Sequence, residues 1–190
     1  MRIKDEAKQQ AVFEATIKLV NEIGFVSSSV SKIAREAKVS PATIYIYYKN
    51  KDDLLVSTYV DIKKALSDAM LKDFDETRPI WETVRRIWFS TFDYIKAHPS
   101  YFQFTEQFAN SPYSCMAAKD KVNKYFEPLT RLIQRGIREK ILKDVEWNLM
   151  FTFMIHPLIV LANNSFKDNI KLERKDIEKA FNMTWDAIKL

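Results

Sequence analysis

Glycine is almost absent from this sequence, and its scarcity limits the folds open to the chain. There are 190 residues but only two glycines and six prolines. A fold rich in β-strands needs many tight turns, and tight turns depend on glycine, proline and other turn formers. Few turn formers in a long chain favour long helices joined by short connections. We therefore predict an all-α fold, and no internal repeat or persuasive strand pattern opposes it.

Helical periodicity is clear near the N-terminus. In residues 4–23, apolar side chains recur at spacings of three and four, which places them on one face of a helix. They are Ala7, Ala11, Val12, Ala15, Leu19, Val20 and Ile23. Gly24 follows directly, and glycine adopts the left-handed conformation that ends many helices. We predict that the first helix ends at Gly24.

Two short helices are predicted next, and each has a serine at its start. Ser29 precedes a helix over 30–37, and Ser40 precedes one from Pro41 to about Tyr47. Serine is a favoured N-cap, and proline suits the first helical position, where a missing N–H costs nothing. Two short helices joined by a tight turn, with a third bracing them, can place the second helix in the major groove of DNA. The N-terminal region therefore predicts a helix-turn-helix head.

Further helices are predicted over most of the remaining chain, which gives about nine in all. They cover approximately residues 51–73, 79–98, 99–109, 116–140, 146–164 and 174–190, with one of the breaks at residues 163–165. The helix over 146–164 is apolar nearly all round, so it must be buried on more than one side.

Composition excludes several function classes. A single cysteine, Cys115, rules out an intramolecular disulfide and a cysteine-based zinc site. The two histidines, His98 and His156, show no metal-ligand spacing, and no set of nucleophile, base and orienting group can be assembled. We expect no metal, no cofactor and no enzymatic activity.

The longest apolar-rich stretch, 149–162, is shorter than the roughly 20 residues that span a bilayer, so we expect a cytoplasmic protein without a membrane partner. The net charge of +5 is compatible with a polyanionic partner but does not by itself indicate one.

Residues from about 10 to 56 resemble the head of the TetR family of transcriptional regulators. The matching residues run in order along the chain: Gly24-Phe25, Ser29-Val30-Ser31-Lys32-Ile33-Ala34, Ala37-Lys38-Val39-Ser40, Ala42-Thr43-Ile44-Tyr45-Ile46-Tyr47-Tyr48-Lys49-Asn50-Lys51 and Leu54-Leu55. The remainder is similar only in its all-helical layout and length. The resemblance implies a helix-turn-helix DNA-binding domain over residues 1–50 and an effector-binding and dimerisation domain over 51–190.

The resemblance also implies which residues contact DNA. Residues of the second helix match positions that touch the backbone, and residues of the third match recognition-helix positions, with Tyr47 and Lys51 the expected phosphate anchors. Including Lys38 in the turn, the expected DNA-binding residues are Ser29, Ser31, Lys32, Lys38, Ser40, Pro41, Ala42, Thr43, Tyr45, Tyr47 and Lys51. The residues Ile33, Ala34, Val39, Ile44 and Tyr48 are instead expected to be core.

Lys38 departs from the family pattern, which usually has glycine in this turn. If the residue must adopt a positive φ, lysine costs roughly 1 kcal/mol more than glycine. We hypothesise that Lys38 reaches a phosphate; simple solvation is the alternative.

Aromatic residues are dense from residue 81 to 153, and helical bundles place ligand pockets between helices, lined by such rings. Plain core packing is the alternative for each ring. Candidate ligand-binding residues are Trp88, Phe92, Phe104, Phe108, Tyr125 and Met154, with polar contacts from Glu106, Gln107, Asn110 or His156. A core or interface role is the alternative for His156. A redox-sensing role for Cys115 lacks a partner cysteine.

The last two predicted helices are expected to form a homodimer interface, which the family resemblance also implies. Two heads on half-sites about 34–36 Å apart multiply affinity for a palindrome. The predicted function is a homodimeric transcriptional repressor that a small, apolar or aromatic effector releases from its double-stranded DNA operator. An activator or structural DNA-binding protein of the same fold, without a small ligand, is an alternative. A helical small-molecule carrier or enzyme with a degenerate head is a more remote one.

Overall fold

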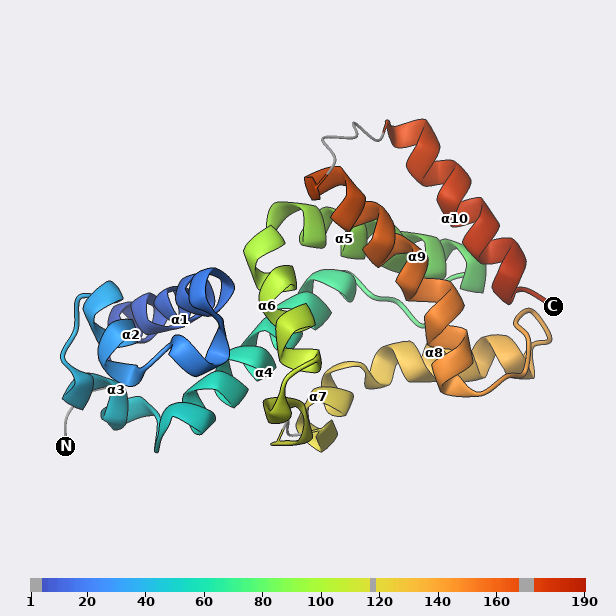
Figure 1. Cartoon of the computed structure of the whole chain (residues 1–190). Helices are drawn as coiled ribbons and strands as arrows, with labels where there is room; N and C mark the ends of the chain where they lie inside the picture. The colour runs from blue at the N-terminus through green and yellow to red at the C-terminus, as the bar shows by residue number, and fades with distance from the viewer. Residues whose placement is uncertain (1–4, 117–118, 168–172) are drawn as a thin grey trace. The chain divides into compact units, whose positions relative to one another are not determined.

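The computed structural model describes residues 5–116, 119–167 and 173–190, and within them every regular element is a helix (Figure 1). The all-α prediction is confirmed. The described helices are α1 (Glu6–Ser27), α2 (Val30–Glu36), α3 (Pro41–Tyr47), α4 (Lys51–Met70), α5 (Ile80–Ala97), α6 (Pro99–Ala109), the 3-10 helix η1 (Pro112–Met116), α7 (Lys119–Tyr125), α8 (Glu127–Arg138), α9 (Trp147–Lys167) and α10 (Arg174–Ile188).

Two predicted helix boundaries are wrong. The single helix predicted over 116–140 is divided near Phe126 into α7 and α8. Pro128 lies in the first turn of α8, where its missing N–H is harmless, but proline cannot continue a helix that began a turn earlier. The break predicted at residues 163–165 is absent, because α9 continues to Lys167. Asparagine and serine lower helix propensity only slightly, and tertiary context overrides such preferences.

Gly24 has the positive φ that the sequence predicts, 76°, but its ψ of 169° is extended and is not the left-handed helical value of a C′ cap. The helical hydrogen-bond pattern nevertheless resumes for about one turn, so α1 extends to Ser27 across a kink. No side chain or backbone atom lies within 4 Å of where a Cβ would stand. The need for glycine at this position therefore comes from backbone conformation and not from crowding.

The chain forms two compact units. The first comprises Met1–Lys64 and Ser100–Val122. One of its hydrophobic clusters joins α1, α2, α3 and the start of α4, with Val12, Ile33, Ile44 and Leu54 among its buried members. A second cluster is built from α1, α4 and α6, where the ring of Phe25 packs against the rings of Phe104 and Phe108.

The second unit comprises Ala65–Pro99 and Asn123–Leu190, and its core lies between α5, α9 and α10. Trp88 is fully buried there, and its indole N–H donates a hydrogen bond to the Met154 carbonyl at 3.0 Å. Arg85 pairs with Glu178 and so joins α5 to α10. The end of the chain is tied to the α8–α9 connection, because the Leu190 N–H bonds the Ile141 carbonyl at 2.9 Å.

None of the described helices is both long and apolar enough to cross a lipid bilayer. The predicted functional division into residues 1–50 and 51–190 does not coincide with the two compact units, because α4 contributes to both and most of α6 belongs to the first.

Candidate functional site

The helices α2 and α3 begin at the serines that the sequence predicts. The Ser29 Oγ accepts the Lys32 backbone N–H at 3.3 Å, and the Ser40 Oγ accepts the Thr43 N–H at 3.2 Å. Pro41 occupies the first turn of α3. Because each helix has only seven residues, its first turn is about half of its length, and the cap hydrogen bond fixes where the helix starts.

The turn between α2 and α3 forces Lys38 into the left-handed region, with φ of 56°. The turn is closed by the Val39 N–H, which bonds the Ala34 carbonyl at 2.9 Å. The Lys38 side chain is exposed. The positive φ that makes glycine the usual residue in this turn is therefore present, and lysine carries its cost.

The expected core of the head is confirmed. Ile33, Ala34, Ile44 and Tyr48 are buried, and Val39 is partly buried against them. Burial raises the pKa of the Tyr48 hydroxyl because it disfavours the phenolate. Outside this core, the Lys18 ammonium donates to Glu36 at 2.6 Å, which raises the pKa of Lys18 and braces α1 against α2.

Eight of the eleven expected DNA-binding residues are exposed. They are Ser29, Ser31, Lys32, Lys38, Ser40, Pro41, Ala42 and Tyr45. Tyr45 presents an aromatic ring with 55% of its surface open to solvent, whereas its neighbour Ile44 is buried. Helix α3 therefore has one face in the core and an exposed face that carries the Tyr45 hydroxyl, with the Ser40 hydroxyl at its N-cap. Such donors are what phosphate oxygens and base edges bind.

The other three, Thr43, Tyr47 and Lys51, are half-buried and hydrogen-bonded within the chain. The Tyr47 hydroxyl accepts the Asp5 N–H at 3.0 Å and donates to the Asp5 carbonyl at 3.1 Å. The Lys51 ammonium donates to the carbonyls of Phe25 at 2.6 Å and Val26 at 3.3 Å. Tyr47 thus ties the start of the chain to α3, and Lys51 caps the last turn of α1. Their contacts with DNA remain a prediction.

The helix-turn-helix geometry agrees with the comparison to known families. A model described as bacterial regulatory proteins, tetR family, matches residues 12–58, and one described as tetracyclin repressor-like, C-terminal domain, matches residues 79–189. The chain belongs to the TetR family. It is a helix-turn-helix DNA-binding transcriptional regulator, and this family is not one of enzymes.

Relatives of this TetR-family chain match it from end to end. A TetR family transcription regulator from Marinobacter aquaeolei VT8 has a solved structure that is 32% identical, with a TM-score of 0.88 over 100% of this chain and 99% of that chain. An uncharacterised HTH-type transcriptional regulator of Haemophilus influenzae is 26% identical over 94% of each chain. The crystal structure of a TetR-family regulator from the same species, 24% identical and covering 100% of both chains, has the same fold with a TM-score of 0.83.

The second unit of this regulator contains a large groove between α8 and the start of α9, with a volume of about 910 Å³. We call it the α8–α9 groove. Its walls mix apolar and polar side chains: Asn123, Phe126, Glu127, Thr130, Arg131, Ile133, Gln134, Ile137, Val145, Trp147, Asn148 and Met150. The volume lies in the range of about 300–1,000 Å³ that small-molecule sites occupy.

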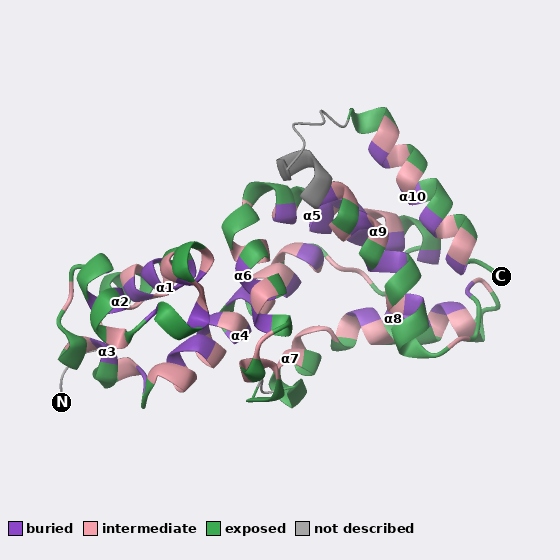
Figure 2. Cartoon of the chain, viewed as in Figure 1, coloured by how far each residue is buried: buried purple, intermediate pink, exposed green. Residues whose placement is uncertain are grey.

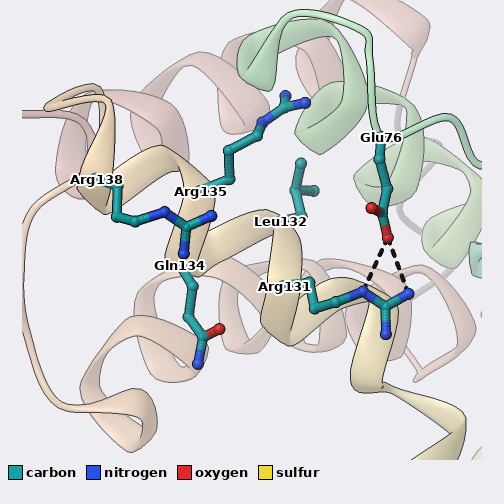
Figure 3. Close-up of a pocket in the computed structure, with 6 residues that line it drawn as sticks. All are labelled: Glu76, Arg131, Leu132, Gln134, Arg135 and Arg138. Atoms are coloured by element: carbon teal, nitrogen blue, oxygen red, sulfur yellow. Dashed lines mark hydrogen bonds and ion pairs between the residues drawn. The ribbon is translucent and has the colours of Figure 1, made fainter.

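A smaller cavity of about 190 Å³ lies along the same helix, and we call it the arginine pocket. Glu76, Arg131, Leu132, Gln134, Arg135 and Arg138 line it (Figure 3). The arginines recur at spacings of four and three, which places their side chains along one side of α8.

The six expected ligand-binding residues do not line either cavity. Trp88, Phe92, Phe104, Phe108 and Met154 are buried, and Tyr125 is partly buried. Phe104 and Phe108 belong to the core of the first unit, whereas the other four belong to the second. His156 is exposed, so it is not a core residue of its own unit, whereas an interface role for it stays a prediction. Ligand contacts by the six remain a prediction. The groove was missed because it depends on how α8 and α9 are rotated, which aromatic density does not reveal.

An apolar stripe faces outward on α9. Leu149, Phe153 and Val160 expose 47%, 48% and 53% of their surfaces, whereas Met154 and Leu158 on the same helix are buried. Figure 2 shows that α9 carries both buried and exposed residues. Met183 of α10 is 73% exposed. Helix α9 therefore presents apolar side chains on its outward side, together with the exposed Thr152 and His156, as well as on the side that packs into its own unit.

Proposed function

We propose that this TetR-family regulator is a homodimeric repressor that a small-molecule effector releases from a palindromic operator. The observation that carries the proposal is the presence, in one chain, of an exposed recognition helix and a groove of ligand size. Helix α4 contributes residues to both compact units and is the natural element to couple them. A coupling of a few kcal/mol is enough to empty an operator.

The outward stripe of α9 supports the dimer. Exposed apolar patches of this kind mark interaction surfaces in proteins that otherwise bury such side chains. One short recognition helix offers few base contacts, and two heads on a palindrome multiply the affinity.

Phe153→Glu places a charge at the centre of the stripe. It should turn the dimer into a monomer in light scattering, and operator affinity should fall at least 100-fold. Gln103→Glu, an exposed change on α6, is the control. A Phe153→Glu protein that remains dimeric would contradict this interface.

Operator binding and release form the central test. Selection from a random DNA library by the purified protein should yield a palindrome. Fluorescence anisotropy on that DNA should then show release when metabolite fractions are added. Transcription from a reporter carrying the operator should rise when the gene is deleted. Expression that falls after deletion would identify an activator instead.

A further inference from the structure

The α8–α9 groove and the arginine pocket adjoin each other. Arg131 and Gln134 line both, so the two cavities meet along α8. The groove contributes apolar side chains such as Phe126, Ile137 and Met150, whereas the pocket contributes three guanidinium groups. One cavity thus suits an apolar body, and its neighbour suits an anionic group.

Charge in the arginine pocket is only partly compensated. The Arg131 Nε donates a hydrogen bond to the Glu76 Oε1 at 2.9 Å, and the Arg131 Nη2 forms an ion pair with the same oxygen at 2.9 Å (Figure 3). Arg138 has no ion pair or hydrogen bond with any described side chain. Three arginines face the Glu76 and Glu139 carboxylates, so the pocket keeps a net positive charge.

Arg135 lies deepest of the three. Its Nη2 donates to the Arg78 carbonyl at 2.5 Å. Its Nε is buried without a hydrogen bond, and the nearest carboxylate oxygen, on Glu139, is 3.5 Å away. A buried donor without an acceptor is costly, and an anion entering the pocket adds the missing negative charge. The planar guanidinium fork matches carboxylate and phosphate oxygens.

Two of the α9 residues that line the groove lie away from the outward stripe. At 3.6 residues per turn, Trp147 and Asn148 are about 140° and 120° around α9 from the mean direction of Leu149, Phe153 and Val160, whereas Met150 is about 80° from it. Trp147 and Asn148 therefore lie outside the stripe that we propose as the dimer interface.

We infer that the effector is an amphipathic anion, with an apolar chain in the α8–α9 groove and a carboxylate or phosphate head among Arg131, Arg135 and Arg138. The inference rests on the proposed effector-responsive function, because it assigns the chemistry of that effector. It also predicts that neither half of such a molecule binds well alone.

Binding of defined probes to the full-length protein tests this inference by isothermal titration calorimetry. Decyl phosphate and decanoate, each below its critical micelle concentration, carry the two head groups on one chain. Decanol supplies the chain without charge, and inorganic phosphate supplies the head alone. At least one of the two anions should bind ten times or more tightly than decanol and inorganic phosphate. The stronger of the two identifies the head group.

Three variants locate the site. Arg138→Gln removes an exposed charge and should weaken the better anion at least fivefold while leaving decanol unchanged. Asn148→Trp fills the groove from an exposed position and should weaken both anions and decanol. Lys96→Gln removes one positive charge from an exposed position on α5, and it should change neither the binding of the anions nor the binding of decanol. Thermal melting checks that each variant is folded.

The outcomes separate this inference from the proposed function. If Arg138→Gln binds the anions as tightly as Lys96→Gln and the parent do, the proposed site is wrong. It is also wrong if the parent binds decanol as tightly as it binds the anions. An Asn148→Trp protein that loses its dimer mass shows that a second copy occupies the groove, and it overturns the inference too. Binding with the expected variant pattern but without operator release supports the site and contradicts effector control.

Discussion

The helix-turn-helix head and the α8–α9 region obtain their geometry in different ways. In the head, α2 and α3 have seven residues each, and their ends are set by Ser29, Ser40 and Lys38 within a few positions of chain. In the second unit, α9 has 21 residues, and its placement depends on side chains far away in sequence, such as Trp88. Local chemistry therefore specifies the helix-turn-helix head, whereas contacts between distant residues shape the α8–α9 groove.

The largest test of this contrast is Trp88→Ala. If Trp88 is a core residue of the second unit, the variant should lose about 3–5 kcal/mol of unfolding free energy, because it empties a buried volume and leaves the Met154 carbonyl without its indole donor. Urea denaturation measures the loss. Trp88→Phe, which keeps most of the volume, should lose clearly less. A loss below about 1 kcal/mol for Trp88→Ala would indicate a ligand-lining residue instead.

Gly136→Ala tests the packing of α8. A Cβ at Gly136 would stand 2.6 Å from the Leu142 Cδ1, and Leu142 is itself buried. We expect a loss of about 1–3 kcal/mol from overpacking. Gly24→Ala is the matched comparison, because it meets no atom within 4 Å and suffers only the positive φ. Equal stability of Gly136→Ala and the parent would show that α8 shifts easily.

Ser40→Ala tests the local control of the head. Removal of the cap on α3 should cost about 1 kcal/mol in stability and weaken operator binding, since α3 is the recognition helix. Ser31→Ala, an exposed change within α2, should leave stability nearly unchanged. Calorimetric melting and anisotropy measure the two effects. An unaltered melting temperature in Ser40→Ala would mean that tertiary contacts alone hold α3.

Lys38→Gly separates backbone strain from DNA contact. Glycine should raise the unfolding free energy by about 1 kcal/mol because φ at this position is positive. If Lys38 reaches a phosphate, the salt slope of operator binding should also fall by about 1. Lys140→Gly is the control: Lys140 also has φ of 56°, but it follows α8. The Lys140→Gly protein should gain stability without a change in the salt slope of operator binding. An unchanged salt slope in Lys38→Gly would mean that the Lys38 ammonium is only solvated and does not reach a phosphate.

Lys63→Met has the smallest expected effect and concerns α4. Burial lowers the pKa of Lys63, whose ammonium lies 5.4 Å from the centre of the Tyr59 ring. Because the folded state binds this proton more weakly than the unfolded state, Lys63 makes stability rise with pH between its folded pKa and about 10.5. The variant should lack this rise of stability with pH. At pH 7 its unfolding free energy should increase by less than about 1 kcal/mol, since the ring contact in the parent offsets part of the cost of burying the ammonium. Urea titrations at pH 7 and pH 9.5 measure both.

Features that depend on neighbouring residues were predictable from the sequence. Ser29 and Ser40 cap their helices because capping chemistry acts over three residues, and Lys38 stood out because the family it resembles usually has glycine in this turn. Pro128 is a sequence signal for the break between α7 and α8, because proline favours the first turn of a helix over its interior.

Features that join distant residues were not predictable. Tyr47 and Asp5 are 42 positions apart, and no periodicity links them. The ring density of residues 81–153 predicted a ligand pocket lined by aromatic rings, with core packing as the alternative, but helix rotation decides which rings are buried. That rotation turned Ile137 and Asn148 toward the groove and Trp88 into the core.

The hydrogen bonds of Lys51 affect how a mutational scan of this regulator should be interpreted. Alanine at position 51 would abolish two hydrogen bonds to the end of α1, so operator binding would fall even if the ammonium never touched a phosphate. Tyr47 presents the same ambiguity, because its loss frees the start of the chain. If variants were scored by repression alone, Lys51 and Tyr47 would both be counted as DNA contacts. Only a separate measurement on the protein without DNA distinguishes residues that bind the operator from those that hold the head in shape.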